Sequence, residues 1–174
     1  MILCDRDIRS ALSSKTIEID PLHDSQIGPT SVDLRLGPLL LRYTTDRIEL
    51  GRSLPETTEV EISPDRGYCL RPAEFVLGCT VERVHLSNGY QGFIETKGDV
   101  ARAGLQVHNC DGHVDPGSDH RITLEISNQN VVPVVLYPEL LICQIFIHTL
   151  SGPCDRVYQG KYLGQTKPTA YKPS

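Results

Sequence analysis

A single stretch of the chain, residues 95–128, holds most of the side chains that are suited to chemistry. It reads ETKGDVARAGLQVHNCDGHVDPGSDHRITLEISN. Two runs within it have the pattern of strands, Leu105 to His108 and Ile122 to Ile126, and the loop between them is dense in Asp, Gly and His. A hairpin would fold that loop back and bring Asp115 near Glu125.

Cations accompany these carboxylates. Lys97 and Arg102 lie just upstream of the loop, and Asp99, Asp111 and His113 belong to the same stretch. Cations beside carboxylates in a polar loop are what a site for an anionic small molecule needs. The same residues would also make an ordinary solvated loop, and composition alone leaves both interpretations open.

The elements that must position this stretch are mainly strands. Apolar runs recur from residue 68 onward between Pro and Gly residues, at the spacing of about 8–12 residues that is typical of an all-β barrel or sandwich. Helix is expected only from Asp5, as its cap, to about Ser14, and over Asp99 to Ala103. The expected strands are Thr16 to Ile19, fragments around Ile48 and Val60, Tyr68 to Leu70, Phe75 to Val84, Gly92 to Glu95, Val131 to Leu136 and Leu140 to His148.

The run from Ser31 to Gly37 alternates polar and apolar residues with a period of two. Val32, Leu34 and Leu36 therefore share one face of a strand, and Asp33 and Arg35 share the other. We expect Asp33 and Arg35 to make a structural ion pair or a subunit contact rather than to take part in catalysis.

Length and charge limit the class of protein. The 174 residues fit one domain, and the net charge of -5 argues against a surface that binds a nucleic-acid backbone. No apolar run approaches the roughly 20 residues of a membrane helix. The opening MILCDRDIRS lacks the pattern of a signal peptide, so we expect a cytoplasmic protein that does not enter a membrane.

The six cysteines, at positions 4, 69, 79, 110, 143 and 154, form no CxxC pair. Structural zinc normally takes its ligands from close pairs, and disulfides are rare in the cytosol, so we expect neither. Cys69, Cys79 and Cys143 lie in apolar runs and are expected to pack as small hydrophobic side chains.

The tail from Tyr158, YQGKYLGQTKPTAYKPS, combines three Tyr and three Lys with no acidic residue. It is too polar to build core. It is therefore either a disordered end or a flap over residues 158–174 that closes on a nucleotide, with aromatic rings for the base and cations for phosphate.

Several motifs resemble one family over nearly the whole chain. They are LCDRDI near the start, TSVDLRLG at 30–37, LRPAEFVLGCTVERVHL at 70–86, LSGP at 150–153 and KYLGQ at 161–165. On these the chain is identified as a divergent member of the dCTP deaminase family, within the dUTPase-like superfamily. The resemblance implies a distorted β-barrel with a short N-terminal helix, assembled as a homotrimer with active sites between subunits.

The resemblance also implies a metal-free deamination. Glu125 matches the glutamate that activates water for attack on C4 of cytosine, and ammonia leaves. The HxE and PCxxC signature of zinc deaminases is absent from the sequence, which agrees with a carboxylate route. Magnesium is expected only with the nucleotide phosphates.

The remaining family positions are substrate contacts. Arg102 matches a phosphate ligand or a support for the catalytic water, and Asp115 matches the contact of the sugar 3′-hydroxyl. Thr123 matches a pyrimidine or sugar contact. Tyr158, Lys161 and Gln165 match residues of the tail that close on the nucleotide.

Two segments depart from the family pattern. Lys97-Gly98-Asp99 replaces Arg-Ser-Ser. The replacement keeps one positive charge, loses the bidentate guanidinium of the arginine and adds a carboxylate near the expected triphosphate. The triphosphate would then sit differently, the substrate would carry fewer phosphates, or the site would have drifted. Cys110-Asp111-Gly112-His113 replaces Thr-Ala followed by His-Arg or Gly-Phe. Gly112 agrees with the bifunctional enzymes of the family, which carry dCTP through to dUMP. We expect Asp111 to pair with a base amino group or with His113.

The leading hypothesis is deamination of a deoxycytidine nucleotide, most simply dCTP to dUTP plus ammonia. One alternative is a bifunctional deaminase and diphosphatase that gives dUMP. The other is a non-catalytic, nucleotide-sensing module on the same fold, which the Lys97-Gly98-Asp99 replacement keeps open.

Overall fold

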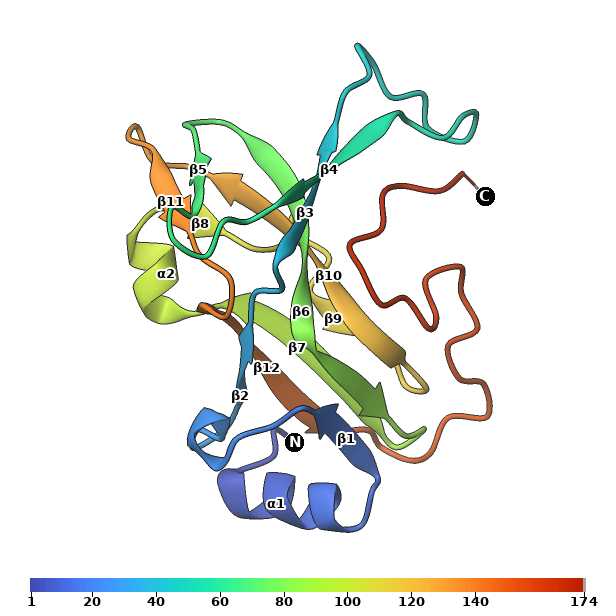
Figure 1. Cartoon of the computed structure of the whole chain (residues 1–174). Helices are drawn as coiled ribbons and strands as arrows, with labels where there is room; N and C mark the ends of the chain where they lie inside the picture. Colours follow the sequence, from blue (N-terminus) through green and yellow to red (C-terminus); the bar gives the residue numbers. More distant parts are fainter. Residues whose placement is uncertain (174) are drawn as a thin grey trace.

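The computed structural model describes residues 1–173, and strands dominate it (Figure 1). The mainly-β prediction is confirmed, with a short N-terminal helix. The elements in chain order are α1 (Asp5–Ser13), β1 (Ile17–Asp20), the 3₁₀ turn η1 (Asp24–Gln26), β2 (Val32–Arg35), β3 (Leu39–Tyr43), β4 (Thr57–Glu61), β5 (Tyr68–Leu70), β6 (Phe75–Leu86), β7 (Tyr90–Thr96), α2 (Gly98–Arg102), β8 (Leu105–Gln106), β9 (His113–Val114), β10 (Asp119–Asn128), β11 (Val134–Leu136) and β12 (Leu141–Thr149).

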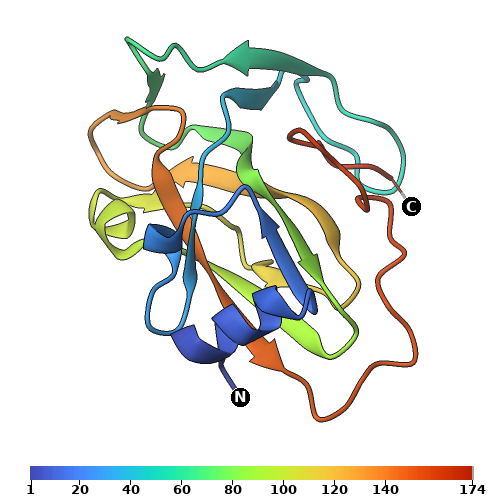
Figure 2. The same ribbon diagram turned by 60° about the horizontal axis from the view of Figure 1, so that its bottom comes forward.

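The strands form three sheets that do not close into one continuous barrel (Figures 1 and 2). In the largest sheet the order is β4-β3-β6-β10-β8, and β1 also pairs with β6. The second sheet has the order β2-β12-β7-β9, and β5 and β11 form a separate pair. The long strand β6 therefore carries β10, which is the strand on which the candidate site is built.

The core follows from the alternation of apolar residues along these strands. Val32, Leu34 and Leu36 are fully buried, as the period-two pattern predicts, and so are Ile145 and Ile147 on β12. Burying a side chain of this size contributes about 1.5–3 kcal/mol, so the facing strands supply most of the stability. None of the helices within residues 1–173 is long and apolar enough to span a bilayer.

Two local predictions are wrong, and one strand was not predicted. Asp5 is the first residue of α1 and not its cap; Cys4 holds the cap position without a side-chain hydrogen bond. No strand forms around Ile48, which lies in the long loop between β3 and β4. Strand β3 was not predicted, because its run of three leucines lacks the alternation that distinguishes a strand from other buried segments.

The six cysteines are free thiols. Cys79 and Cys143 are buried, as expected, and burial raises the pKa of Cys79 to about 11. Cys69 differs from the expectation, because it lies on the short β5–β11 pair and its side chain is exposed.

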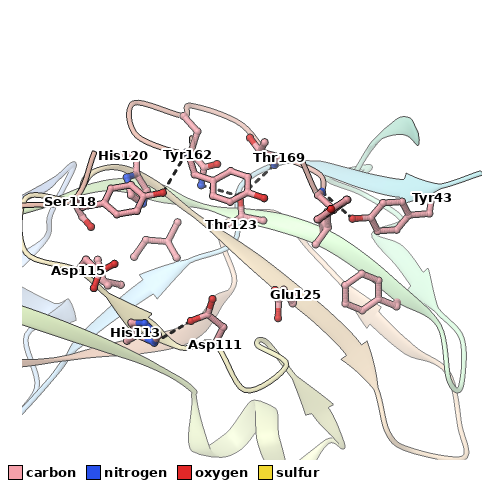
Figure 3. Close-up of a pocket in the computed structure, with 17 residues that line it drawn as sticks. Tyr43, Asp111, His113, Asp115, Ser118, His120, Thr123, Glu125, Tyr162 and Thr169 are labelled. Carbon is pink, nitrogen blue, oxygen red and sulfur yellow. Dashed lines mark hydrogen bonds and ion pairs between the residues drawn. The ribbon is translucent and has the colours of Figure 1, made fainter. Parts of the chain in front are cut away.

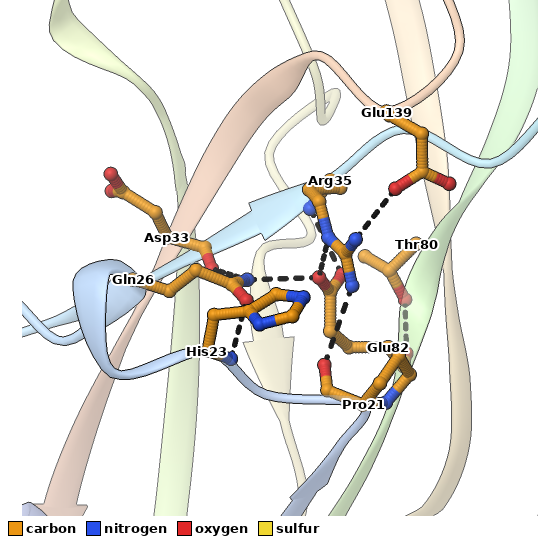
Figure 4. A network of polar contacts seen from close by, with 8 residues as sticks. All are labelled: Pro21, His23, Gln26, Asp33, Arg35, Thr80, Glu82 and Glu139. Atoms are coloured by element: carbon orange, nitrogen blue, oxygen red, sulfur yellow. Dashed lines mark hydrogen bonds and ion pairs between the residues drawn. The ribbon is translucent and has the colours of Figure 1, made fainter.

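A buried polar network ties the first sheet to the second (Figure 4). The carboxylate of Glu82, on β6, is fully buried and accepts hydrogen bonds from Arg35 Nε at 2.7 Å and Gln26 Nε2 at 2.9 Å. Arg35 also reaches Glu139 at 2.6 Å, before β12. The hydrogen bond and charge of Glu82 raise the pKa of Arg35, so this guanidinium stays protonated.

The network predicts a large effect at Glu82. Removing one partner of a buried ion pair leaves the other without compensation, so Glu82→Ala should lower the free energy of unfolding by about 3 kcal/mol or more. Glu82→Gln keeps one acceptor oxygen for the side chains of Arg35 and Gln26 and should cost less. Urea denaturation measures both, with Arg6→Ala, an exposed arginine on α1, as the control. A Glu82→Ala protein as stable as the control would contradict this account.

Candidate active site

A cavity of about 350 Å³ lies where β10, the loop before it and the C-terminal tail meet (Figure 3). This volume falls in the range of about 300–1,000 Å³ that is usual for small-molecule sites. Its lining residues are Tyr43, Phe75, Leu77, Asp111, His113, Val114, Asp115, Ser118, His120, Ile122, Thr123, Glu125, Tyr158, Tyr162, Gln165, Thr169 and Tyr171.

An irregularity in β10 decides which of its side chains face this cavity. The register on β6 shifts between Arg121, opposite Arg83, and Thr123, opposite Cys79. At the shift, the N–H of Ile122 donates to the Thr80 hydroxyl at 2.9 Å instead of to a backbone carbonyl. Strict alternation would put residues 119 and 121 on the face of Thr123 and Glu125. The shift puts His120 into the lining of the cavity in their place.

Glu125 is held in the cavity by the loop that faces it. Its Oε2 accepts a hydrogen bond from the backbone N–H of Asn109 at 2.7 Å, and its own N–H donates to the carbonyl of Val107 at 2.8 Å. The rings of Tyr43 and Phe75, stacked 6.3 Å apart, line the same cavity. A carboxylate fixed beside aromatic faces suits proton transfer next to a planar base.

The loop between β8 and β10 brings further carboxylates to the cavity. Asp111 and Asp115 both line it, together with Glu125. Asp111 Oδ1 lies 3.0 Å from His113 Nδ1, the second of the two partners expected for Asp111. Gly112 packs on β7, where an added Cβ would lie 2.6 Å from the carbonyl oxygen of Ile94, so this position requires glycine.

The tail lies across the cavity and is bonded to β10 and β3 (Figure 3). Gln165 Nε2 donates to the hydroxyl of Thr123 and to the carbonyl of Arg121, both at 2.9 Å. The N–H of Thr169 also donates to the Thr123 hydroxyl, and the N–H of Tyr171 donates to the Tyr43 hydroxyl at 3.2 Å. Residues 158–173 thus have the position that a closed flap would have; residue 174 lies outside the described residues.

The expected site residues divide into two groups. Glu125, Asp115, Thr123, Tyr158 and Gln165 line one cavity. The second group does not line it: Lys97, Gly98, Asp99, Arg102 and Lys161. The first four of these belong to α2 and its N-cap, and α2 lies on the far side of the molecule from the tail in both views (Figures 1 and 2).

The cations of the second group already have partners. Lys97 Nζ lies 2.6 Å from Asp33 Oδ2, and both side chains are largely buried, so Lys97 ties α2 to β2. Asp33 and Arg35 therefore make separate ion pairs and not one with each other. Arg102 Nη1 donates to the carbonyl of Gly98 at 2.9 Å on the exposed surface of α2. Lys161 contacts the carbonyl of Lys172 within the tail.

The cavity carries negative charge. Asp111, Asp115 and Glu125 line it, and none of its lining residues within 1–173 is a lysine or an arginine. Burial lowers the pKa of His120, against the opposing effect of Asp119, so this imidazole is neutral near pH 7. Among the described residues, no three His, Cys, Asp or Glu side chains gather as a set of metal ligands.

Some lining residues were not expected from the sequence. Tyr162 and Tyr171 belong to the tail, whose richness in tyrosine indicated that it could line a nucleotide site. Tyr43 and Phe75 come from strand ends far apart in the chain. His120 carried no signal, because its orientation depends on the register shift in β10.

Comparison with known proteins identifies the family. The family model described as dCTP deaminase-like matches residues 2–150. A protein named dCTP deaminase, dUMP-forming, from Dictyoglomus thermophilum is 40% identical over 185 residues, which cover 98% of this chain and 93% of the relative. A protein of the same name from Beutenbergia cavernae is 37% identical over 179 residues, covering 98% of this chain and 93% of the relative. The chain therefore belongs to the dCTP deaminase-like family, as its motifs predict.

Solved structures agree on the fold. The 2′-deoxycytidine 5′-triphosphate deaminase from Agrobacterium tumefaciens superposes with a TM-score of 0.66 at 21% identity, over 86% of this chain and 48% of that longer chain. A dUTPase mutant from Staphylococcus bacteriophage 80alpha superposes with a TM-score of 0.50 at 12% identity, covering 83% of this chain and 97% of that one. At these identities the likeness shows a shared fold, which confirms the dUTPase-like prediction.

The bonds of Gln165 predict that this side chain holds the tail in place. Gln165→Ala removes two hydrogen bonds to β10, so cleavage of the tail by a protease at low concentration should become several-fold faster. Gln159→Ala, an exposed glutamine of the same tail, is the matched control. Equal cleavage rates for the two variants would show that Gln165 does not anchor the tail.

Proposed function

We propose that this protein is a bifunctional enzyme that converts dCTP to dUMP, releasing ammonia and pyrophosphate. The observation that carries the proposal is the carboxylate of Glu125, fixed by the N–H of Asn109 inside a cavity with aromatic walls. The curated relatives named above, about 40% identical over nearly their whole length, support the substrate and the product.

Deamination follows from a single well-placed carboxylate. Glu125 takes a proton from water as the oxygen attacks C4 of cytosine, which gives a tetrahedral carbon. The carboxyl group then passes the proton to the 4-amino group, the C–N bond breaks, and ammonia leaves a uracil ring. The fixed position of Glu125 on β10 serves this shuttle, because the carboxylate must stay within hydrogen-bond reach of both the attacking water and the 4-amino group at C4.

Hydrolysis of the phosphate chain follows at the other end of the same nucleotide. Asp115 orients the sugar through its 3′-hydroxyl and helps to activate the water that attacks phosphorus, with pyrophosphate as the leaving group. The names of the relatives and Gly112 favour dUMP as the product over dUTP, the simplest product inferred from sequence alone. Magnesium enters with the phosphates as part of the substrate.

Tail residues 158–173 act as a flap in this proposal. Tyr158 and Tyr162 line the cavity with Gln165, so the segment covers a bound nucleotide and excludes bulk water. The hydrogen bonds from Gln165 and Thr169 to Thr123 close it on β10. Lys161, on the outer side of the flap, would reach the phosphates only after its contact with Lys172 is broken.

The phosphates need cations that this cavity lacks. We infer that α2 of a neighbouring subunit supplies Arg102, in a homotrimer whose active sites lie between subunits. Two facts support this arrangement: Arg102 is exposed on α2, and α2 lies far from the tail of its own chain. Lys97, paired with Asp33, then positions α2 and leaves direct phosphate binding to Arg102.

The proposal predicts the products of the purified protein. With dCTP and magnesium, the wild type should release ammonia and form dUMP, and Glu125→Gln should lower ammonia release by about 100-fold or more, because the amide cannot carry the proton. Chromatography resolves dUMP, dUTP and dCTP, and a coupled assay measures ammonia. Glu95→Gln, an exposed carboxylate outside the cavity, is the control. Accumulation of dUTP would contradict the proposed diphosphatase activity. Binding of dCTP without release of ammonia would indicate a nucleotide-sensing module.

The shared site predicts complementation between two inactive variants. Glu125→Gln lacks the proton shuttle and Arg102→Ala lacks the phosphate contact, and each should be nearly inactive alone. If they are co-expressed in equal amounts, each mixed trimer should have about one active site in three, where a normal Glu125 meets a normal Arg102 across an interface, which is about a quarter of all sites. The two proteins purified separately and then mixed serve as the control before subunit exchange. No recovery in mixed trimers would place both residues in one subunit's site.

A further inference from the structure

His120 is a polar residue of the cavity lining whose role the family resemblance does not supply. Its ring lines the cavity with Asp115 and Ser118, on the side away from Tyr43 (Figure 3). Glu125 marks the base end of the proposed nucleotide and Asp115 marks its sugar end. His120 therefore lies at the sugar end.

The environment of the ring determines which nitrogen carries the proton. Nδ1 of His120 is buried and has no hydrogen-bond partner among residues 1–173. A buried N–H without an acceptor is costlier than a buried lone pair without a donor, so Nδ1 is the unprotonated nitrogen. Nε2 is not buried in this way, so the neutral ring presents its only N–H donor from Nε2. The lowered pKa of His120 agrees, because protonation would place a second, unpartnered N–H at Nδ1.

The neighbours of the ring keep it in this orientation. The ring of Tyr158 packs against it with centroids 6.1 Å apart, and the N–H of Tyr158 is bonded to the carbonyl of Pro116 at 2.8 Å. The backbone of His120 is paired in register with Val84 of β6. The ring therefore lies against Tyr158 of the tail, on a residue whose backbone is held in the sheet.

We propose that His120 recognises the 3′-oxygen of the deoxyribose as a hydrogen-bond donor, opposite Asp115. A hydroxyl group both donates and accepts, and Asp115, an acceptor, satisfies only its hydrogen. The neutral N–H of His120 satisfies its oxygen without adding a cation to the cavity. His120 is then a specificity residue for a free 3′-hydroxyl. This inference rests on the proposed function, because it takes the sugar position from Asp115.

Equilibrium binding tests the inference by pairing a protein change with a substrate change. The nucleotides are the α,β-imido analogues of dCTP and of 2′,3′-dideoxycytidine triphosphate, titrated into protein that carries Glu125→Gln, so that neither deamination nor release of pyrophosphate occurs. His120→Phe keeps the packing on Tyr158 and removes the donor. It should weaken dCTP binding by about 3- to 10-fold, the usual effect of one hydrogen bond, and leave binding of the dideoxy nucleotide within about twofold.

Two further variants make the result specific. His120→Gln retains an N–H donor and should recover part of the dCTP affinity. His85→Phe is the matched control, because Nδ1 of His85 is also buried without a partner but His85 does not line the cavity. If His120→Phe weakens the binding of both nucleotides equally, His120 contributes only packing and the inference is overturned. The inference is also overturned if the binding of neither nucleotide is weakened. Failure of the protein before the His120 change to bind dCTP at all would instead overturn the proposed function.

Discussion

The pairing of β10 on β6, with its shift of register between Arg121 and Thr123, is the constraint on which the candidate site depends. One side of the shift places Thr123 and Glu125 toward the cavity, and the other side places His120 there. A regular strand would have offered Arg121 instead, a cation beside the carboxylate that we propose to be catalytic. β10 pairs with β6 along most of its length, and on its other side the N–H of Glu125 is bonded to the carbonyl of Val107, so the backbone that carries Glu125 is held on both sides.

Charge is distributed in the molecule so that the proposed base site and the proposed phosphate contacts lie on different elements. The cavity holds three carboxylates and the neutral imidazole of His120, which suits the proton transfers of deamination. The cations that the family resemblance assigns to the phosphates belong to α2 and to the tail, and α2 lies away from the cavity of its own chain. Lys97 contributes little free charge there, because Asp33 neutralises it and the pair is largely buried. The replacement of Arg-Ser-Ser by Lys97-Gly98-Asp99 therefore changes the anchoring of α2 more directly than it changes the lining of the cavity.

Much of this could be predicted from the sequence, and the exceptions have physical causes. The period-two pattern identified β2 with its buried leucines, and the family motifs placed Glu125, Asp115, Thr123 and Gln165 in one cavity. The role of Lys97 could not be predicted, because its partner Asp33 is distant in sequence and meets it only through the packing of β2 beside β12. His120 depends on a register shift that no local pattern reveals. The unexpected strand β3 shows the same limit for a continuous apolar run.

The central claim is that the cavity on β10 holds the cytosine ring and that a neighbouring subunit completes the phosphate site. A crystal structure of the Glu125→Gln protein with the α,β-imido analogue of dCTP and magnesium tests it most directly. The account predicts C4 of the base within hydrogen-bond reach of residue 125 through one water, Tyr158 and Tyr162 over the nucleotide, and the phosphates at Arg102 of another subunit. A nucleotide bound outside this cavity, or phosphates held within a single chain, would contradict it.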